Sequence, residues 1–167
     1  AHVIDLNGSI QIDSLKIGEN GHLKLKSNSS LEVLIDIHTE GGNLDNEGAL
    51  KGSNLFLHKG YFINRNEVLI SENILTDNAL MVNNGKITAK KIELDQGAVM
   101  GTGIFISDDF WNKGKIKPGL EDSIIGTLTF SSHLINDGNI ELDLNNNKQS
   151  DLIITNELTL KGQLTIN

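Results

Sequence analysis

Short segments in which apolar and polar residues alternate recur along the whole chain. They include residues 15–17, 23–25, 55–57, 92–94, 140–144, 158–160 and 164–166. Alternation with a period of two places the apolar side chains on one face, as in a half-buried β-strand. No window of ten or more residues shows sustained helical spacing with start and stop signals. The pattern therefore predicts an all-β protein.

A seven-residue phrase repeats between these segments: apolar, any, Asn, any, Gly or Asn, any, apolar. It occurs five times, at residues 44–50, 62–68, 81–87, 110–116 and 134–140. Its central residues are Asn46, Asn64, Asn83, Asn112 and Asn136, so the gaps between them are 18, 19, 29 and 24 residues. A unit of about 20 residues that returns with variable insertions indicates a solenoid, in which each repeat stacks on its neighbours.

The chemistry of the phrase predicts a corner between strands. Asn and Gly enter the left-handed backbone region at low cost, so they supply a bend that most residues resist. In a parallel β-helix, corner Asn side chains of successive coils can stack about 4.8 Å apart. We therefore expect the five Asn residues to be structural corner turns. The long gap between Asn83 and Asn112 predicts an inserted segment, with Phe110 or Trp111 capping the core beneath it.

A β-sandwich or an antiparallel barrel is the alternative fold, because many short strands with frequent turns fit it as well. The recurring corner favours the β-helix, since the hairpins of a sandwich need not resemble each other. The chain also has one Pro and no Cys, so it lacks the proline and disulfide hallmarks of secreted sandwiches.

The amino-acid composition is consistent with a thin solenoid and argues against nucleic acid and anionic membranes as partners. The 167 residues suffice for one domain, and a hydrophobic share of 38% suits a solenoid with little core per residue. The net charge is −8 and Arg65 is the only Arg, so no basic patch is available for nucleic acid or an anionic membrane surface.

The C-terminal third carries an ordered series of five motifs. They are a Pro-Gly turn at Pro118 and Gly119, a strand that begins Gly126-Thr127-Leu128, an acidic-apolar strand at 139–144, a strand from Asp151, and a strand containing Leu160 and Gly162. This order resembles the end of the passenger domain in autotransporters (type V secretion) of Gram-negative bacteria, over roughly residues 116–166. The upstream Asn-x-Gly phrases are similar to those of filamentous-haemagglutinin-like exoproteins.

The resemblance implies a single-stranded right-handed parallel β-helix (solenoid), secreted or displayed on the cell surface. It divides the one β-helix domain, residues 1–167, into stem coils at 1–113 and autochaperone-like coils at 114–167. The latter would nucleate folding after export through an outer-membrane translocator barrel of the parent protein. Residues 164–166 still have a strand pattern with no polar cap, so we expect the native chain to continue past residue 167.

Motifs for catalysis or for metal and cofactor binding are missing from the sequence. There is no Gly-x-Ser-x-Gly elbow and no Gly-Asp-Ser-Gly, and Ser132 and His133 would point to opposite faces of a strand. The five His residues are far apart and no Cys accompanies them. Alternate oxygen ligands from Asp143 to Asp151 lack the central Gly and closing Glu of a calcium loop. We expect no enzyme, no cofactor and no metal.

Three hypotheses for function remain open at this point. The first is an adhesin or self-association module that binds a host surface protein, a glycan or a neighbouring cell through the side of the β-helix. The second is the stalk of a larger secreted protease or toxin whose active domain lies outside this chain. A polysaccharide lyase or hydrolase is a lower alternative, because Asp108-Asp109 or Glu121-Asp122 could serve as acid and base. A single Arg argues against an enzyme for anionic polysaccharides.

Overall fold

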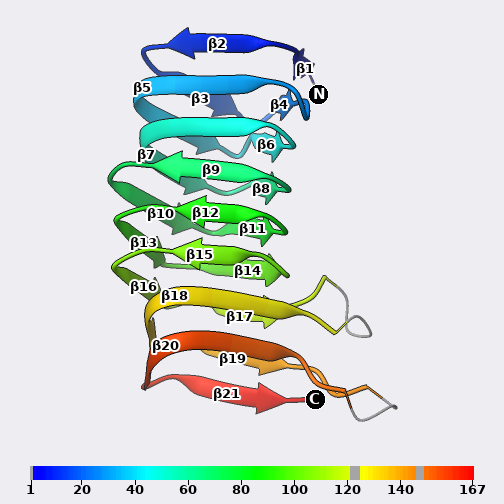
Figure 1. The fold of residues 1–167 in the computed structure, drawn as a ribbon, viewed down its shortest axis with the longest axis vertical. Coiled ribbons are helices and arrows are strands. Elements are labelled where there is room, and N and C mark those ends of the chain that lie inside the picture. The colour runs from blue at the N-terminus through cyan, green and yellow to red at the C-terminus, as the bar shows by residue number, and fades with distance from the viewer. Residues whose placement is uncertain (1, 121–124, 146–148) are drawn as a thin grey trace.

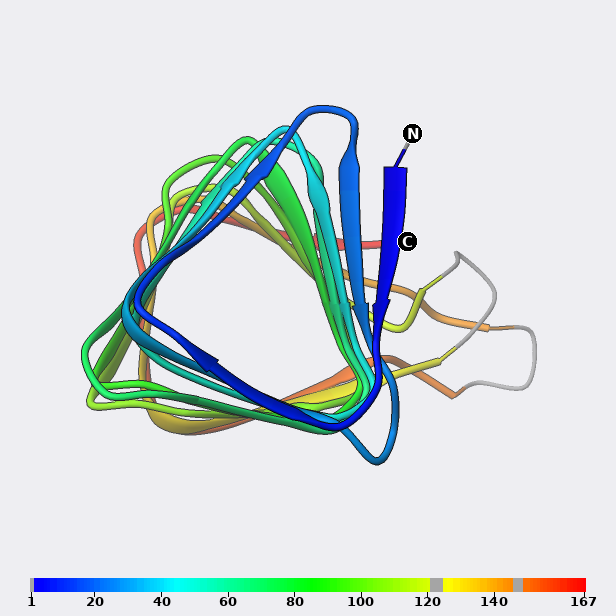
Figure 2. The same ribbon diagram turned by 90° about the horizontal axis from the view of Figure 1, so that it is seen from above.

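The chain winds into a stack of three-sided coils. The computed structural model describes residues 2–120, 125–145 and 149–167. In Figure 1 the strands lie across the long axis and successive coils stack along it. The view along that axis in Figure 2 shows a roughly triangular cross-section. Every pairing between the named strands of the described residues is parallel, which confirms the parallel β-helix and excludes the sandwich and the antiparallel barrel.

The first side of the triangle is a nine-stranded sheet. In spatial order its strands are β1 (His2–Leu6), β4 (Gly21–Leu25), β6 (Asn43–Asn46), β8 (Tyr61–Asn64), β11 (Ala79–Asn83), β14 (Gly97–Gly101), β17 (Lys115–Pro118), β19 (Asn139–Leu142) and β21 (Gln163–Ile166). Each coil contributes one short strand, so neighbouring coils are joined by a continuous ladder of parallel hydrogen bonds.

A 12-stranded sheet bends to form the other two sides. The second side contains β2 (Ser9–Ile12), β9 (Glu67–Ile70), β12 (Lys86–Thr88) and β15 (Ile104–Ile106). The third side contains β3 (Leu15–Gly18), β10 (Asn73–Asp77), β13 (Lys91–Leu94) and β16 (Asp109–Asn112). Four long strands run through both sides, namely β5 (Ser30–Glu40), β7 (Ala49–His58), β18 (Thr127–Asn136) and β20 (Leu152–Leu160).

The core is a set of apolar columns that run the length of the stack. Alternation places every second residue of each strand inward, so equivalent positions of successive coils lie directly above one another. One column of the first side consists of Leu44, Phe62, Met81, Val99, Ile116 and Ile140, all buried. Within the described residues, no helix is long and apolar enough to cross a membrane.

The corner Asn residues form two ladders at different corners. Asn46, Asn64 and Asn83 end strands of the first side, where the amide of Asn46 donates to Oδ1 of Asn64 and the amide of Asn64 donates to Oδ1 of Asn83, both at 2.9 Å. Asn112 and Asn136 end β16 and β18 on the third side, and the Asn112 amide donates to Oδ1 of Asn136. All five side chains are fully buried. The five Asn side chains therefore connect neighbouring coils in two separate ladders and not in one continuous stack.

The insertion predicted between Asn83 and Asn112 is wrong. All residues in this interval are described, and Gly101 takes the place of Asn in the first corner, paired in register with Asn83. The 29-residue gap arises because the phrase moves from one corner to another. Phe110 accordingly caps nothing: it packs in the core against Phe105 and Phe130, with ring centroids 5.1 and 4.8 Å away.

The glycine of the phrase is needed for close approach and not for a left-handed backbone. Gly85 and Gly138 both have ordinary φ values, in contrast to the expectation from the sequence. A Cβ on Gly85 would lie 2.2 Å from the carbonyl oxygen of Asn66, and one on Gly138 would lie 2.1 Å from that of Gly114. Any side chain at these positions would push adjacent coils apart, because they are only about 4.8 Å from each other.

The side chain of Asp151 connects the last coils through hydrogen bonds. Its carboxylate, 3% exposed, accepts hydrogen bonds from the backbone N–H of Gly126 at 2.8 Å and of Asp143 at 3.0 Å. Asp143 is itself buried and lies 3.2 Å from the ammonium of Lys117. These contacts join segments that are far apart in the sequence, so Asp151 has a structural role beyond its place in the motif.

The other motif residues lie at strand ends or inside the core. Gly119, just after Pro118 at the end of β17, has a φ of +80° and exchanges two backbone hydrogen bonds with Gly101. Thr127 opens β18 and Leu128 is fully buried, whereas Leu160 is 46% exposed on the last coil. The sheets run without a break from 1–113 into 114–167, and a separate folding role for the last coils stays a prediction.

Candidate binding face

The third side presents three outward columns of side chains, which we call the third-side face. Parallel pairing in register sets the columns, because residues that pair across coils project from the same side. The middle column contains His38, Phe56, Leu75, Glu93, Trp111 and Ile135. The column before it contains Asn54, Asn73, Lys91, Asp109 and His133. The corner beyond it contains His58, Asp77, Asp95 and Lys113.

Aromatic rings are concentrated at two levels of this face. Phe56 stacks on His38 with ring centroids 4.6 Å apart. Trp111 lies beneath the ammonium of Lys91, which is 4.5 Å from the ring centroid. Both rings are partly exposed, unlike the buried Phe residues of the core. Such half-exposed rings are typical of binding surfaces, where they supply contact area at low entropic cost.

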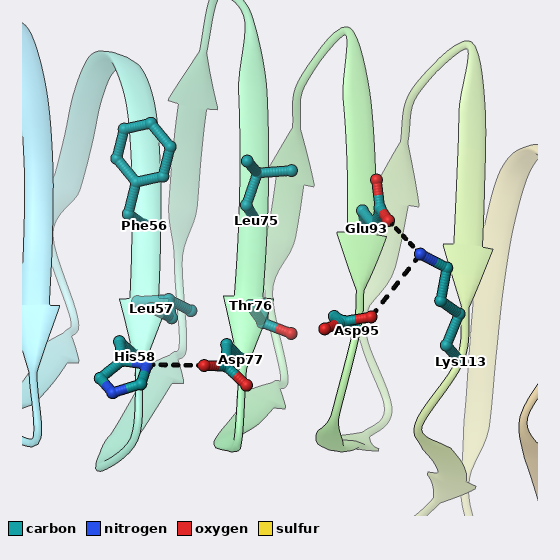
Figure 3. Close-up of a pocket in the computed structure, with 9 residues that line it drawn as sticks. All are labelled: Phe56, Leu57, His58, Leu75, Thr76, Asp77, Glu93, Asp95 and Lys113. Carbon is teal, nitrogen blue, oxygen red and sulfur yellow. Dashed lines mark hydrogen bonds and ion pairs between the residues drawn. The ribbon is translucent and has the colours of Figure 1, made fainter.

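A groove of about 450 Å³ lies between these two levels. Phe56, Leu75 and Glu93 line it in the middle column, and His58, Asp77, Asp95 and Lys113 line it at the corner. Leu57 and Thr76 complete the lining (Figure 3). Another hollow lies on the second side beside Leu34 and Leu69, but no aromatic ring lines it.

Ion pairs hold the charged groups of the groove in place. The carboxylate of Glu93 accepts from Lys113 at 2.6 Å and from Lys91 at 2.9 Å. The hydrogen bond from Lys113, followed by that from Lys91, lowers the pKa of Glu93 below its ordinary value. The same bond raises the pKa of Lys113. Lys113 also lies 3.6 Å from Asp95, so one ammonium connects two carboxylates.

His58 and Asp77 form the second polar pair of the groove. Nδ1 of His58 lies 2.7 Å from Oδ2 of Asp77 (Figure 3). A carboxylate can only accept, so Nδ1 carries the hydrogen and Nε2 of the neutral ring is an acceptor. The other oxygen of Asp77 accepts from the amide of Asn78 at 3.0 Å. The pair thus offers fixed polar atoms beside an apolar floor.

The structure places the side chains of Ser132 and His133 on opposite faces of β18. Ser132 points inward toward Ser107 while His133 points outward between Asp109 and Thr159, so the predicted opposite orientation of Ser132 and His133 is confirmed. β18 continues through both residues. No group of three His, Cys, Asp or Glu in the described chain is placed to hold a metal ion. Glu121, Asp122 and Asn147 lie outside the described residues.

Comparisons with protein family models, with curated proteins and with solved structures give no match to this chain. The sequence-predicted sites, the corner Asn residues and the C-terminal motif, are buried or structural for the most part. The third-side face was not predicted as a site. Its signal in the sequence was present but weak: Phe56 and Trp111 occupy outward positions of alternating segments in a chain whose aromatic share is only 4%.

Proposed function

We propose that this chain is a binding module that attaches to surfaces through the third-side face. The observation that carries the proposal is the groove between Phe56 and Glu93, which combines a partly exposed ring, an exposed Leu and fixed charges. A flat solenoid side repeats weak contacts from coil to coil, so several weak contacts add to useful avidity.

The wider setting follows from the sequence resemblance alone. The chain is proposed as part of the passenger of a secreted or surface-displayed autotransporter, acting as an adhesin or a self-association module. Its partners would be a host surface protein, a glycan or a neighbouring cell. The alternative is that the chain is the stalk of a larger secreted protease or toxin.

Adhesion of coated beads tests the proposal. Beads that carry the folded chain should attach to host cells in a saturable manner, and the soluble chain should displace them. Beads that carry the heat-unfolded chain are the control for non-specific adsorption. If the folded chain attaches no better than the unfolded chain, the proposed binding function is wrong and the stalk hypothesis is favoured.

A further inference from the structure

The groove has the shape of a slot beside an aromatic ring. His38, Phe56 and Leu75 follow one another in three successive coils, so His38 covers one side of the Phe56 ring and Leu75 lies on the other. The side chain of Leu75 is shorter than that of Phe56 in the preceding coil. It is also shorter than the Glu93–Lys113 pair in the following coils. Figure 3 shows the Phe56 ring with its broad face turned to the viewer, Leu75 in the next coil and the Glu93–Lys113 pair beyond it, and these residues line the slot.

The hydroxyl group of Thr76 lies beneath the floor of the groove. Thr76 lines the groove and is 2% exposed, and its Oγ1 has no hydrogen-bond partner among the described residues. Thr76 alternates with the outward Leu75 and lies in register with the core residues Leu57 and Leu94, so its side chain points into the core and a ligand in the groove would not reach it.

The charged residues decide which ligands fit. Three carboxylates, Asp77, Glu93 and Asp95, line the slot, against one ammonium from Lys113 and the imidazole of His58. Excess negative charge repels an anionic ligand, and the carboxylates accept hydrogen bonds from hydroxyl groups. A ring with apolar C–H groups on one face and hydroxyls at its edge matches this combination of features.

We infer that the groove binds a pyranose ring of a neutral glycan, with the ring stacked on Phe56 and its hydroxyls bonded to Asp77 and Glu93. The inference rests on the proposed binding function and names the class of ligand for that site. Glycans that carry uronic or sialic acids are excluded by charge, because the chain as a whole has a net charge of −8 as well.

Titration of the ¹⁵N-labelled chain with neutral hexasaccharides tests the inference. The probes are the hexamers of β-1,4-glucose, α-1,4-glucose and N-acetylglucosamine, with a hexamer of galacturonic acid as the anionic comparison. At least one neutral probe should shift the amide signals of residues 56–58 and 75–77, while the anionic probe leaves them unchanged. The inference is overturned by equal shifts with galacturonic acid, by shifts confined to other sides, or by no shifts with any neutral probe.

Matched substitutions separate the slot from the rest of the surface. Leu75→Arg fills the slot, and Leu80→Arg places the same side chain on the first side, where Leu80 is equally exposed at 37%. Leu75→Arg should raise the dissociation constant at least about tenfold, and Leu80→Arg should change it less than twofold. Equal effects of the two variants contradict a site in the slot.

Bead adhesion distinguishes failure of the glycan inference from failure of the binding function. Beads are tested on host cells pretreated with glycosidases or with a protease. Attachment that survives removal of neutral glycans but is lost after proteolysis overturns the glycan inference and leaves the binding function intact. Beads that attach to no untreated cells overturn the binding function itself.

Discussion

At the scale of single residues, the protein uses the same amino acid for two purposes. Asn residues at the corners are buried and bridge coils through their side-chain amides. Asn64, Asn83 and Asn112 also accept a hydrogen bond from the backbone N–H two residues later. Asn54 and Asn73 lie on the outer face, where they continue a partly exposed polar column. Burial, more than residue type, decides how much each contributes to stability, because an unpaired amide inside the stack has no water to bond.

Asn83→Ala should lower the free energy of unfolding by about 1–3 kcal/mol, since it leaves buried polar groups unpaired. Asn83 accepts from the amide of Asn64 and the backbone N–H of Gly85, and donates to the carbonyl of Ile104. Urea unfolding monitored by circular dichroism measures the effect. The exposed residue Asn28 provides the control, and Asn28→Ala should change stability by less than about 0.5 kcal/mol. Equal losses would contradict the ladder.

Glu93 makes stability depend on pH in a defined direction. Its pKa is lower in the folded state because Lys113 and Lys91 donate to its carboxylate, so it stabilises the fold above its ordinary pKa of 4.5. That contribution is lost as the pH falls below 4.5 and the carboxylate takes up a proton. Glu93→Gln should therefore shrink the difference in melting temperature between pH 7 and pH 3.5. Glu72→Gln, which removes an exposed carboxylate elsewhere, is the control.

At the scale of elements, alternation predicted the strands well, and the phrase predicted corners. Residues 55–57, 92–94 and 158–160 all lie within strands of the structure. The sequence could not reveal that the phrase occupies two corners, because Asn83 and Asn112 have the same local pattern. The register between coils makes the difference, and it is set by pairing over the whole stack. The groove was missed for the same reason, since it joins residues from four coils.

Asp151 is the contact that we expect to be most important for the last coils. Asp151→Asn keeps the shape of the side chain but replaces one acceptor oxygen by an amide that faces a backbone N–H. The variant should unfold about 1–3 kcal/mol more easily, through loss of a charge-assisted hydrogen bond. Hydrogen exchange should locate the loss in β18, β19 and β20. Unchanged protection of these strands would show that Asp151 does not hold them together.

At the scale of the whole molecule, one coil offers a test of all three sides at once. Leu69 in β9, Leu75 in β10 and Leu80 in β11 point outward on the second, third and first sides, with exposures of 45, 37 and 37%. The chain has no Cys, so a single Cys introduced at each position gives a unique attachment point. The three positions therefore lie on different sides of the β-helix but at nearly the same level along its axis.

The most direct measurement is bead adhesion by the chain with a polyethylene glycol chain of fixed mass attached at each of these positions. Binding through the third-side face predicts that attachment at Leu75→Cys abolishes adhesion, whereas attachment at Leu69→Cys or Leu80→Cys preserves it. The unlabelled Cys variants show whether any loss comes from the substitution itself. Adhesion that survives modification at position 75, or is lost equally at all three positions, would contradict the account.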